Sequence, residues 1–174
     1  MPTEVILIRH GEPRYDEISK RKYVGMGYDL GRLTPLGIEQ AEKRARDPLL
    51  HGATLILSSP YTRALQTAAI LSRVTQIPIM VENDLHEWMP DTTFKFDFDI
   101  QKGFLEFVKA KGVRQDVHRY PWETFDHLKE RVRKAIEPYL NHEKIIVVFH
   151  GIAMSTLTDF DDVIEHCGIR RIFL

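Results

Sequence analysis

Short apolar runs recur along the chain, separated by polar stretches and by segments with helical periodicity. Four of these runs, at residues 5–8, 53–57, 77–81 and 145–149, consist mostly of apolar side chains. Apolar runs of this length are typical of strands that are buried on both faces of a sheet. The four runs are therefore predicted to be strands of one central sheet.

Helix signals lie between these runs. The pairs Thr34-Pro35 and Ser59-Pro60 each place a hydroxyl side chain where it can cap a helix, and a proline at the first helical position. The helix after Ser59 is predicted to reach about residue 72, because its apolar residues keep a helical spacing to that point. Further helices are expected at residues 101–111 and 123–140 and after residue 151.

The alternation of strands and amphipathic helices determines the expected fold class, which is α/β with a mostly parallel sheet. Residues 13–33 are polar and rich in glycine, so they are predicted to form a loop. No internal repeat or Pro/Ser-rich linker divides the chain. A single domain is expected over residues 1–174.

Residues 88–100 allow two interpretations. Phe94, Phe96 and Phe98 alternate with polar residues, which is the pattern of a strand. Pro90 and several acidic residues in the same stretch also fit an aromatic loop over a cleft. The three rings could cover a cleft or form a dimer surface, and the oligomeric state stays open.

Composition and charge exclude several partners. Lys and Arg number 24 and Asp and Glu 25, so the net charge of −1 gives no field for nucleic acid or an anionic membrane. Cys167 is the only cysteine; it is predicted to be a buried structural thiol. No apolar stretch reaches the length of a membrane span or fits a signal peptide, so a soluble, cytoplasmic protein is expected.

Two of the predicted strands end in the same dipeptide. Residues 9–11 read Arg-His-Gly and residues 150–151 read His-Gly. Ligands of open α/β sheets bind outside the carboxyl ends of the strands, so parallel strands would bring both imidazoles to one edge. Arg63 lies in the first turn after the strand at 53–57, where a cation opposes the helix dipole. That placement is explained if an anion binds between Arg63 and the helix.

These residue types fit phosphoryl transfer. Arginine donates in a planar, bidentate geometry that matches phosphate oxygens, as Arg9 and Arg63 could do here. A neutral imidazole such as that of His10 is a competent nucleophile, and neighbouring cations favour its neutral form. Glu87 follows the strand at 77–81 and could protonate a leaving oxygen if its pKa is raised. Two nearby acids are alternatives for that role: Asp84 and Asp91.

Five motifs in the same order resemble the histidine phosphatase superfamily, whose fold is shared with cofactor-dependent phosphoglycerate mutases. The motifs stand at residues 9–12, 33–41, 58–68, 85–87 and 150–151, and residues 123–132 are similar to a weaker helical motif of the family. The resemblance spans about residues 4–157. It implies a three-layer α/β/α, phosphoglycerate mutase-like architecture.

The resemblance also implies residue roles. His10 would be phosphorylated transiently, and Glu87 would donate the proton to the leaving group. Four residues would hold the phosphoryl group: Arg9, Gly11, Arg63 and His150. No metal or organic cofactor would be needed, and the partner would be a small-molecule phosphomonoester.

The chain departs from the family pattern in particular places. Asp16 stands where many members have an asparagine that contacts phosphate; an aspartate would repel phosphate unless it is protonated, paired with Arg14 or turned away. Residues 89–99 match no mutase pattern, and because the chain ends soon after His150, the final strand is expected to be short or missing. Five further histidines are predicted to be surface or packing residues: His51, His118, His127, His142 and His166.

Three functions remain in competition at this point. The first is a phosphomonoester phosphatase acting through phosphohistidine, and the second is a phosphomutase that uses the same residues. The third is a catalytically silent phosphate-binding module, suggested by Asp16 and by residues 88–100. Hydrolysis is favoured because no mutase insertion is recognisable, and specificity is expected to lie in residues 13–32 and 88–120.

Overall fold

A five-stranded, mostly parallel sheet forms the centre of the molecule. The computed structural model describes all residues from 1 to 174 and orders the strands β3-β2-β4-β1-β5. The strands are β1 (Glu4–Arg9), β2 (Ile56–Ser58), β3 (Ile79–Val81), β4 (Lys144–Phe149) and β5 (Ile169–Phe173). The first four are parallel, as predicted, and β5 pairs with β1 in the antiparallel direction. The expectation that the final strand is short or missing is therefore wrong.

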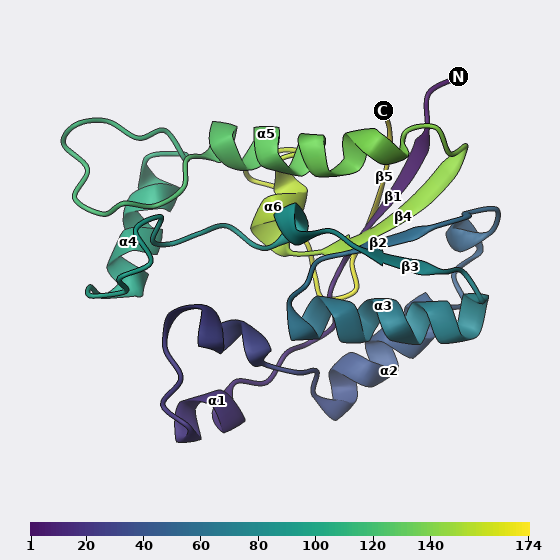
Figure 1. The fold of residues 1–174 in the computed structure, drawn as a ribbon, viewed down its shortest axis with the longest axis horizontal. Helices are drawn as coiled ribbons and strands as arrows, with labels where there is room; N and C mark the ends of the chain where they lie inside the picture. Colours follow the sequence, from purple (N-terminus) through teal and green to yellow (C-terminus); the bar gives the residue numbers. More distant parts are fainter.

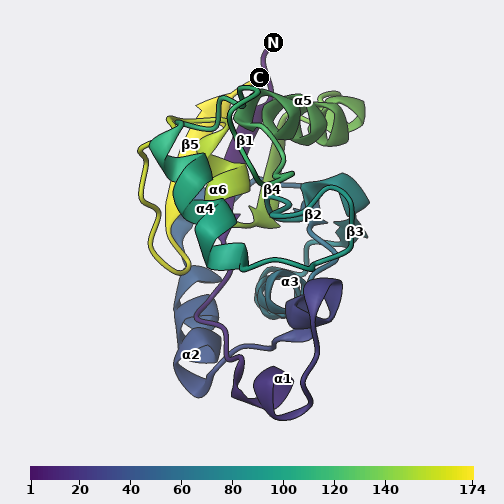
Figure 2. The same cartoon turned by 90° about the vertical axis from the view of Figure 1, so that its left-hand side faces the viewer.

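Helices cover both faces of this sheet and give the expected three layers (Figure 1). The helices are α1 (Asp16–Lys20), α2 (Pro35–Arg44), α3 (Thr62–Thr75), α4 (Ile100–Lys109), α5 (Phe125–Ile136) and α6 (Gly151–Ser155). Helices α2 and α3 lie on one side of the sheet and α5 and α6 on the other, while α1 and α4 stand near the edge where β1 and β4 end (Figures 1 and 2). None of the helices is long and apolar enough to cross a membrane.

The core is split into two layers by the alternation of side chains along the strands. Val5 and Leu7 of β1 belong to a cluster of 18 buried residues on the side of α5 and α6. Ile6 and Ile8 belong to a cluster of 15 on the side of α2 and α3. The two clusters exclude water from both faces of β1 and β4, which explains why residues 5–8 and 145–149 are apolar at every position. Cys167 lies in the second cluster, where burial raises its thiol pKa to about 11; the predicted structural thiol is confirmed.

One of the two predicted helix caps is confirmed and the other is wrong. Thr34 Oγ1 accepts the backbone N–H of Gly37 at 2.9 Å, and α2 begins with Pro35 as expected. Helix α3 begins only at Thr62, so Ser59 lies three residues before it and is not its N-cap. Ser59 Oγ instead accepts the N–H of Tyr61 at 3.2 Å and contacts His150 Nε2 at 2.7 Å.

Residues 88–100 form an irregular loop, which decides between the two interpretations of this stretch. Phe94 and Phe96 have backbone φ angles of 59° and 49°, a left-handed conformation that bulky residues rarely adopt and that no strand contains. Residues 13–33, predicted as a loop, also contain α1 and the short 3₁₀ helix η1 (Gly25–Leu30).

Candidate active site

The predicted site residues meet at the carboxyl edge of the sheet. Arg9 at the end of β1 pairs in register with Phe149 at the end of β4, so the next residue of each strand is a histidine at the same level. The His10 and His150 rings lie 5.2 Å apart between centroids. Arg63, from the first turn of α3, places its Nε 3.3 Å from His10 Nε2. Parallel pairing thus brings together residues that are more than fifty positions apart.

His10 is arranged as a neutral imidazole with one unprotonated ring nitrogen, Nε2. Its Nδ1 lies 2.7 Å from the carbonyl oxygen of Gly11, which can only accept, so Nδ1 carries the proton. Its Nε2 accepts from Arg63 Nε and is therefore unprotonated. Burial, reinforced by the charge of Arg63, holds the pKa of His10 well below its usual value. The imidazole is thus in the form that can attack phosphorus through Nε2.

Two buried nitrogen atoms beside His10 have no hydrogen-bond partner in the protein: Arg9 Nε and His150 Nδ1. The Ser59 hydroxyl accepts from Tyr61 and can donate to His150 Nε2, which leaves the imidazole proton of His150 on Nδ1. Buried donors normally have a hydrogen-bond partner. Two donors without partners next to a nucleophile therefore point to a ligand with acceptor oxygens. A phosphoryl group supplies such oxygens.

Asp29 also belongs to this site, although no sequence pattern points to it. Its Oδ1 lies 3.0 Å from Arg63 Nη1, and the Arg63 side chain is only 6% exposed. Burial raises the pKa of Asp29, and the adjacent Arg63 opposes this rise. Asp29 belongs to η1, within a polar, glycine-rich stretch that carries no periodic signal. Only the folded chain shows that it faces a buried arginine.

Glu87 is the acid that best fits the role of proton donor. Its carboxyl group accepts backbone N–H groups of Ile152 at 3.2 Å and Ala153 at 2.9 Å, next to His150. Burial raises its pKa above the usual value, although these hydrogen bonds oppose the rise. A carboxyl group with a raised pKa keeps its proton longer and can donate it to a leaving oxygen.

The two alternative acids do not share this environment. Asp84 is exposed. Asp91 is fully buried, but its carboxylate accepts hydrogen bonds from the backbone of Thr93 at 2.8 Å and Phe96 at 2.7 Å. Burial alone would raise the pKa of Asp91, yet these hydrogen bonds lower it, so Asp91 stays ionised and holds the loop. No cluster of three or more His, Cys, Asp or Glu side chains that could hold a metal ion occurs in the structure.

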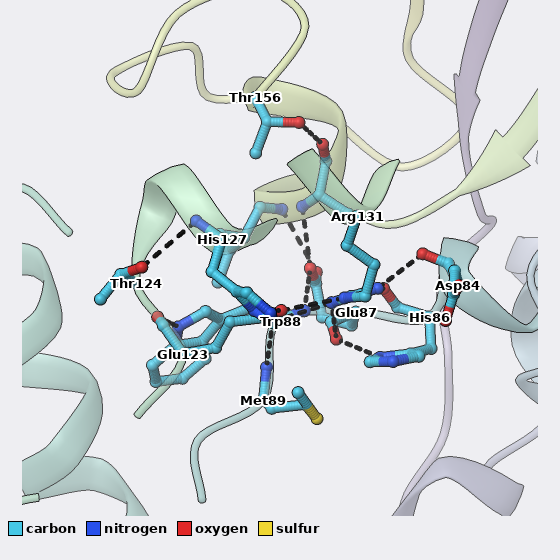
Figure 3. Close-up of polar contacts among 12 residues, drawn as sticks. Asp84, His86, Glu87, Trp88, Met89, Glu123, Thr124, His127, Arg131 and Thr156 are labelled. Atoms are coloured by element: carbon cyan, nitrogen blue, oxygen red, sulfur yellow. Dashed lines mark hydrogen bonds and ion pairs between the residues drawn. The ribbon is translucent and has the colours of Figure 1, made fainter. Parts of the chain in front are cut away.

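A buried ion pair supports the segment that carries Glu87 (Figure 3). Arg131 of α5 donates twice to Glu123, with distances of 2.9 and 2.8 Å. The same guanidinium donates to three backbone carbonyls, those of Asp84, His86 and Glu87. Glu123 in turn accepts from the backbone N–H of Met89 at 3.2 Å. The pair therefore fixes the peptide groups on both sides of Glu87.

The structure shows that Gly11 is needed for close packing and that Asp16 is paired with Arg14. The N–H of Gly11 already donates to Thr67 Oγ1 at 3.0 Å, so it is not free for the predicted phosphate contact. A Cβ at position 11 would lie 2.5 Å from the carbonyl oxygen of Gly37, so glycine is required here by close packing. Asp16 pairs with Arg14 at 2.7 Å, and this hydrogen-bonded ion pair lowers the pKa of Asp16 to about 2.

His166, expected to be a surface or packing residue, is half-buried and packs beside His10. Its ring centroid lies 5.8 Å from that of His10. The segment after α6 returns to the site: Arg9 Nη1 donates to the carbonyl of Ile164, and the N–H of Cys167 donates to the carbonyl of His10 at 3.2 Å. The last recognisable motif ends before this segment, so no motif indicated that it reaches the site.

Comparison with known proteins agrees with this geometry. The sequence model of the histidine phosphatase superfamily (branch 1) matches residues 5–160. A bifunctional protein of Mycobacterium tuberculosis is 29% identical over 169 residues, which cover 90% of this chain and 41% of that protein. The adenosylcobalamin/alpha-ribazole phosphatase of Escherichia coli is 28% identical over 159 residues, covering 87% of this chain and 75% of the relative.

Solved structures share the fold. YhfR of Bacillus stearothermophilus superposes with a TM-score of 0.72 at 22% identity, covering 98% of this chain and 90% of that one. The chain spans less than half the length of the mycobacterial relative named above. The likeness to YhfR therefore concerns the architecture of the domain.

Proposed function

Since the chain belongs to the histidine phosphatase superfamily, we propose that it hydrolyses small phosphomonoesters through a transient phosphohistidine at His10, without a metal ion. The observation that carries this proposal is the neutral, buried His10 with its Nε2 directed at Arg63 and two unpaired donors beside it. Together these groups offer a nucleophile and cationic donors for the equatorial oxygens of a phosphoryl group.

In the first step His10 Nε2 attacks phosphorus while the bond to the leaving oxygen breaks. Arg9 and Arg63 neutralise the charge on the equatorial oxygens, and His150 Nδ1 donates a hydrogen bond to one of them. Glu87 transfers its proton to the leaving oxygen, so an alcohol departs and a carboxylate remains.

In the second step the Glu87 carboxylate takes a proton from a water molecule as that water attacks the phosphoryl group. The bond between phosphorus and Nε2 breaks, inorganic phosphate leaves, and His10 returns to its neutral form. Glu87 is again protonated, so the site is ready for the next substrate molecule.

Hydrolysis is favoured over phosphoryl transfer between substrates by the surroundings of the site. A mutase has to hold a second anionic group of its substrate while the phosphoryl group moves. The pocket next to Glu87 is lined by no Lys, Arg or His side chain that could do so. Transfer to water requires no such group.

Direct capture of the intermediate tests the proposal. Rapid mixing with p-nitrophenyl phosphate in the presence of a chelator, followed by alkaline quenching and mass spectrometry, is expected to show phosphate on the peptide that contains His10. Phosphohistidine survives alkali and is lost in acid, so an acid-quenched sample is the control. Turnover that stops with chelator, or phosphate on any other residue, would contradict the proposal.

Replacement of Glu87 by glutamine tests the proton donor. We expect kcat/KM for an alkyl phosphate to fall about 100-fold, because a poor leaving group needs the proton, and to fall less than about tenfold for p-nitrophenyl phosphate. Wild-type kcat/KM for the alkyl ester should decline as pH rises through the raised pKa of Glu87, since the ionised form cannot donate. The variant should lack this alkaline decline; equal losses on both substrates would exclude the role.

A further inference from the structure

A pocket of about 520 Å³ opens beside Glu87, and its walls are mainly hydrophobic, with several aromatic residues. Of the 17 lining residues 11 are hydrophobic. Six aromatic lining residues come from two segments, residues 23–28 and 88–98: Tyr23, Tyr28, Trp88, Phe94, Phe96 and Phe98. This volume lies in the range of small-molecule binding sites. Aromatic walls favour a ligand that offers a flat, apolar ring for stacking.

The charge of the pocket excludes anionic ligands beyond the phosphoryl group. None of its lining residues is Lys, Arg or His, whereas Asp29 and Glu87 are among them. Lys111, a cation that follows α4, does not line the pocket. It binds Asp161 at 2.6 Å instead. A carboxylate or second phosphate in this pocket would lose its hydration without gaining a cationic partner.

The two loops that form the pocket hold each other in place. Phe94 and Phe96 keep positive φ angles, and the buried Asp91 carboxylate maintains this turn through the N–H of Phe96. A Cβ at Gly25 would lie 2.6 Å from the Phe96 ring, so η1 and the 88–100 loop are in close contact. Backbone strain that is maintained by specific contacts is typical of binding sites.

The pocket is continuous with the site of the reaction. Asp29 lines it and binds Arg63, which contacts His10. Tyr61 also lines it and lies with its ring centroid 5.2 Å from that of His150. Glu87 stands at the boundary, where the proton must reach the leaving oxygen. When the phosphoryl group is transferred to His10, the departing alcohol therefore lies in this pocket.

We propose that the natural substrate is a phosphomonoester of a neutral alcohol that carries an aromatic ring, bound with the ring in this pocket. The proposal rests on the phosphatase function above and names its substrate class. It predicts poor turnover of phosphorylated hydroxy acids and of bisphosphates, whose second anionic group would face Asp29 and the apolar walls.

A matched substrate pair tests the proposal. 3-Phenylpropyl phosphate and 4-(phosphonooxy)butanoate are both primary alkyl phosphates with similar leaving groups, and they differ in a phenyl ring against a carboxylate. The kcat/KM of the phenyl ester is expected to be at least about tenfold higher. A ratio of one or below would overturn the proposed substrate class. If neither ester nor p-nitrophenyl phosphate were turned over, the phosphatase function itself would be contradicted, and the substrate class with it.

Two variants locate the preference in the pocket. Phe94→Asn removes a ring that is 58% exposed and keeps a residue type that tolerates positive φ, so the ratio should fall several-fold. Met26→Lys places a cation among the lining residues and should lower the ratio by improving the carboxylate ester. The control is Phe173→Asn, on β5 with 56% exposure, which should leave the ratio unchanged. If the ratio of kcat/KM for the two esters changes in neither pocket variant, the proposal is overturned. This ratio does not depend on the amount of folded protein, so partial unfolding cannot imitate the result.

Discussion

Replacement of His10 by alanine is expected to lower kcat/KM for p-nitrophenyl phosphate by about 10⁴-fold or more. The reason is geometric: no other nucleophilic atom occupies the place of His10 Nε2 beside Arg63. The Nε2 atom of His150 is bound to Ser59, and the thiol of Cys167 is buried. The measurement is steady-state hydrolysis with a chelator present. Arg9, Arg63 and His150 remain in the variant, so inorganic phosphate should still raise its melting temperature.

His166 provides the matched control for this experiment. It is a half-buried histidine whose ring lies 5.8 Å from that of His10, but the mechanism gives it no bond to make or break. We expect His166→Ala to lose less than about tenfold in kcat/KM, the level at which indirect effects on a neighbour are common. A His10→Ala protein that keeps activity comparable with His166→Ala would exclude His10 as the nucleophile.

The strands were predictable where the sequence is an unbroken apolar run, even at the exposed edge strand β3, and not where charged residues interrupt the run. Strands β1 and β4 are covered on both faces, and each appears in the sequence as an unbroken apolar run. Strand β5 is a sheet edge with the sequence Ile-Arg-Arg-Ile-Phe, and none of its residues is buried. Arg170 and Arg171 instead bind Asp162 and Glu4. An edge strand stabilised by ion pairs leaves no apolar pattern, which is why this strand was missed.

The site was predictable where its residues lie at the ends of regular elements. His10, Arg63 and His150 follow strands or open a helix, so strand direction alone predicted that they meet. Asp29 and His166 reach the same place from irregular segments, whose course depends on long-range contacts such as that between Gly25 and Phe96. For the same reason, the three rings of residues 88–100 could be assigned to a strand or a loop until the left-handed turns at Phe94 and Phe96 were seen.

Replacement of Arg131 by methionine is expected to destabilise the protein by about 3–5 kcal/mol, because the buried carboxylate of Glu123 would lose its partner. Thermal or urea unfolding measures this loss. Lys134→Met is the matched control: it removes an ion pair with Glu130 on the same helix, at 2.6 Å compared with 2.8 Å for Arg131–Glu123 but exposed, and should cost less than about 1 kcal/mol. Equal effects of the two substitutions would show that the buried pair has no special role.

The pH dependence of the same variant distinguishes an unpaired charge from simple loss of packing. In the wild type, burial raises the pKa of Glu123, but the hydrogen bonds and charge of Arg131 outweigh this and lower it. Without Arg131 the pKa should rise, so the folded state would bind a proton more tightly than the unfolded state, and its stability would increase as pH falls. The difference in melting temperature between wild type and Arg131→Met should therefore shrink from pH 7 to pH 5. A Glu123→Gln/Arg131→Met double variant has no carboxylate at position 123 to protonate. Its difference in melting temperature from wild type should therefore not shrink in this way. An equal shrinkage in both variants would exclude the unpaired charge as the cause.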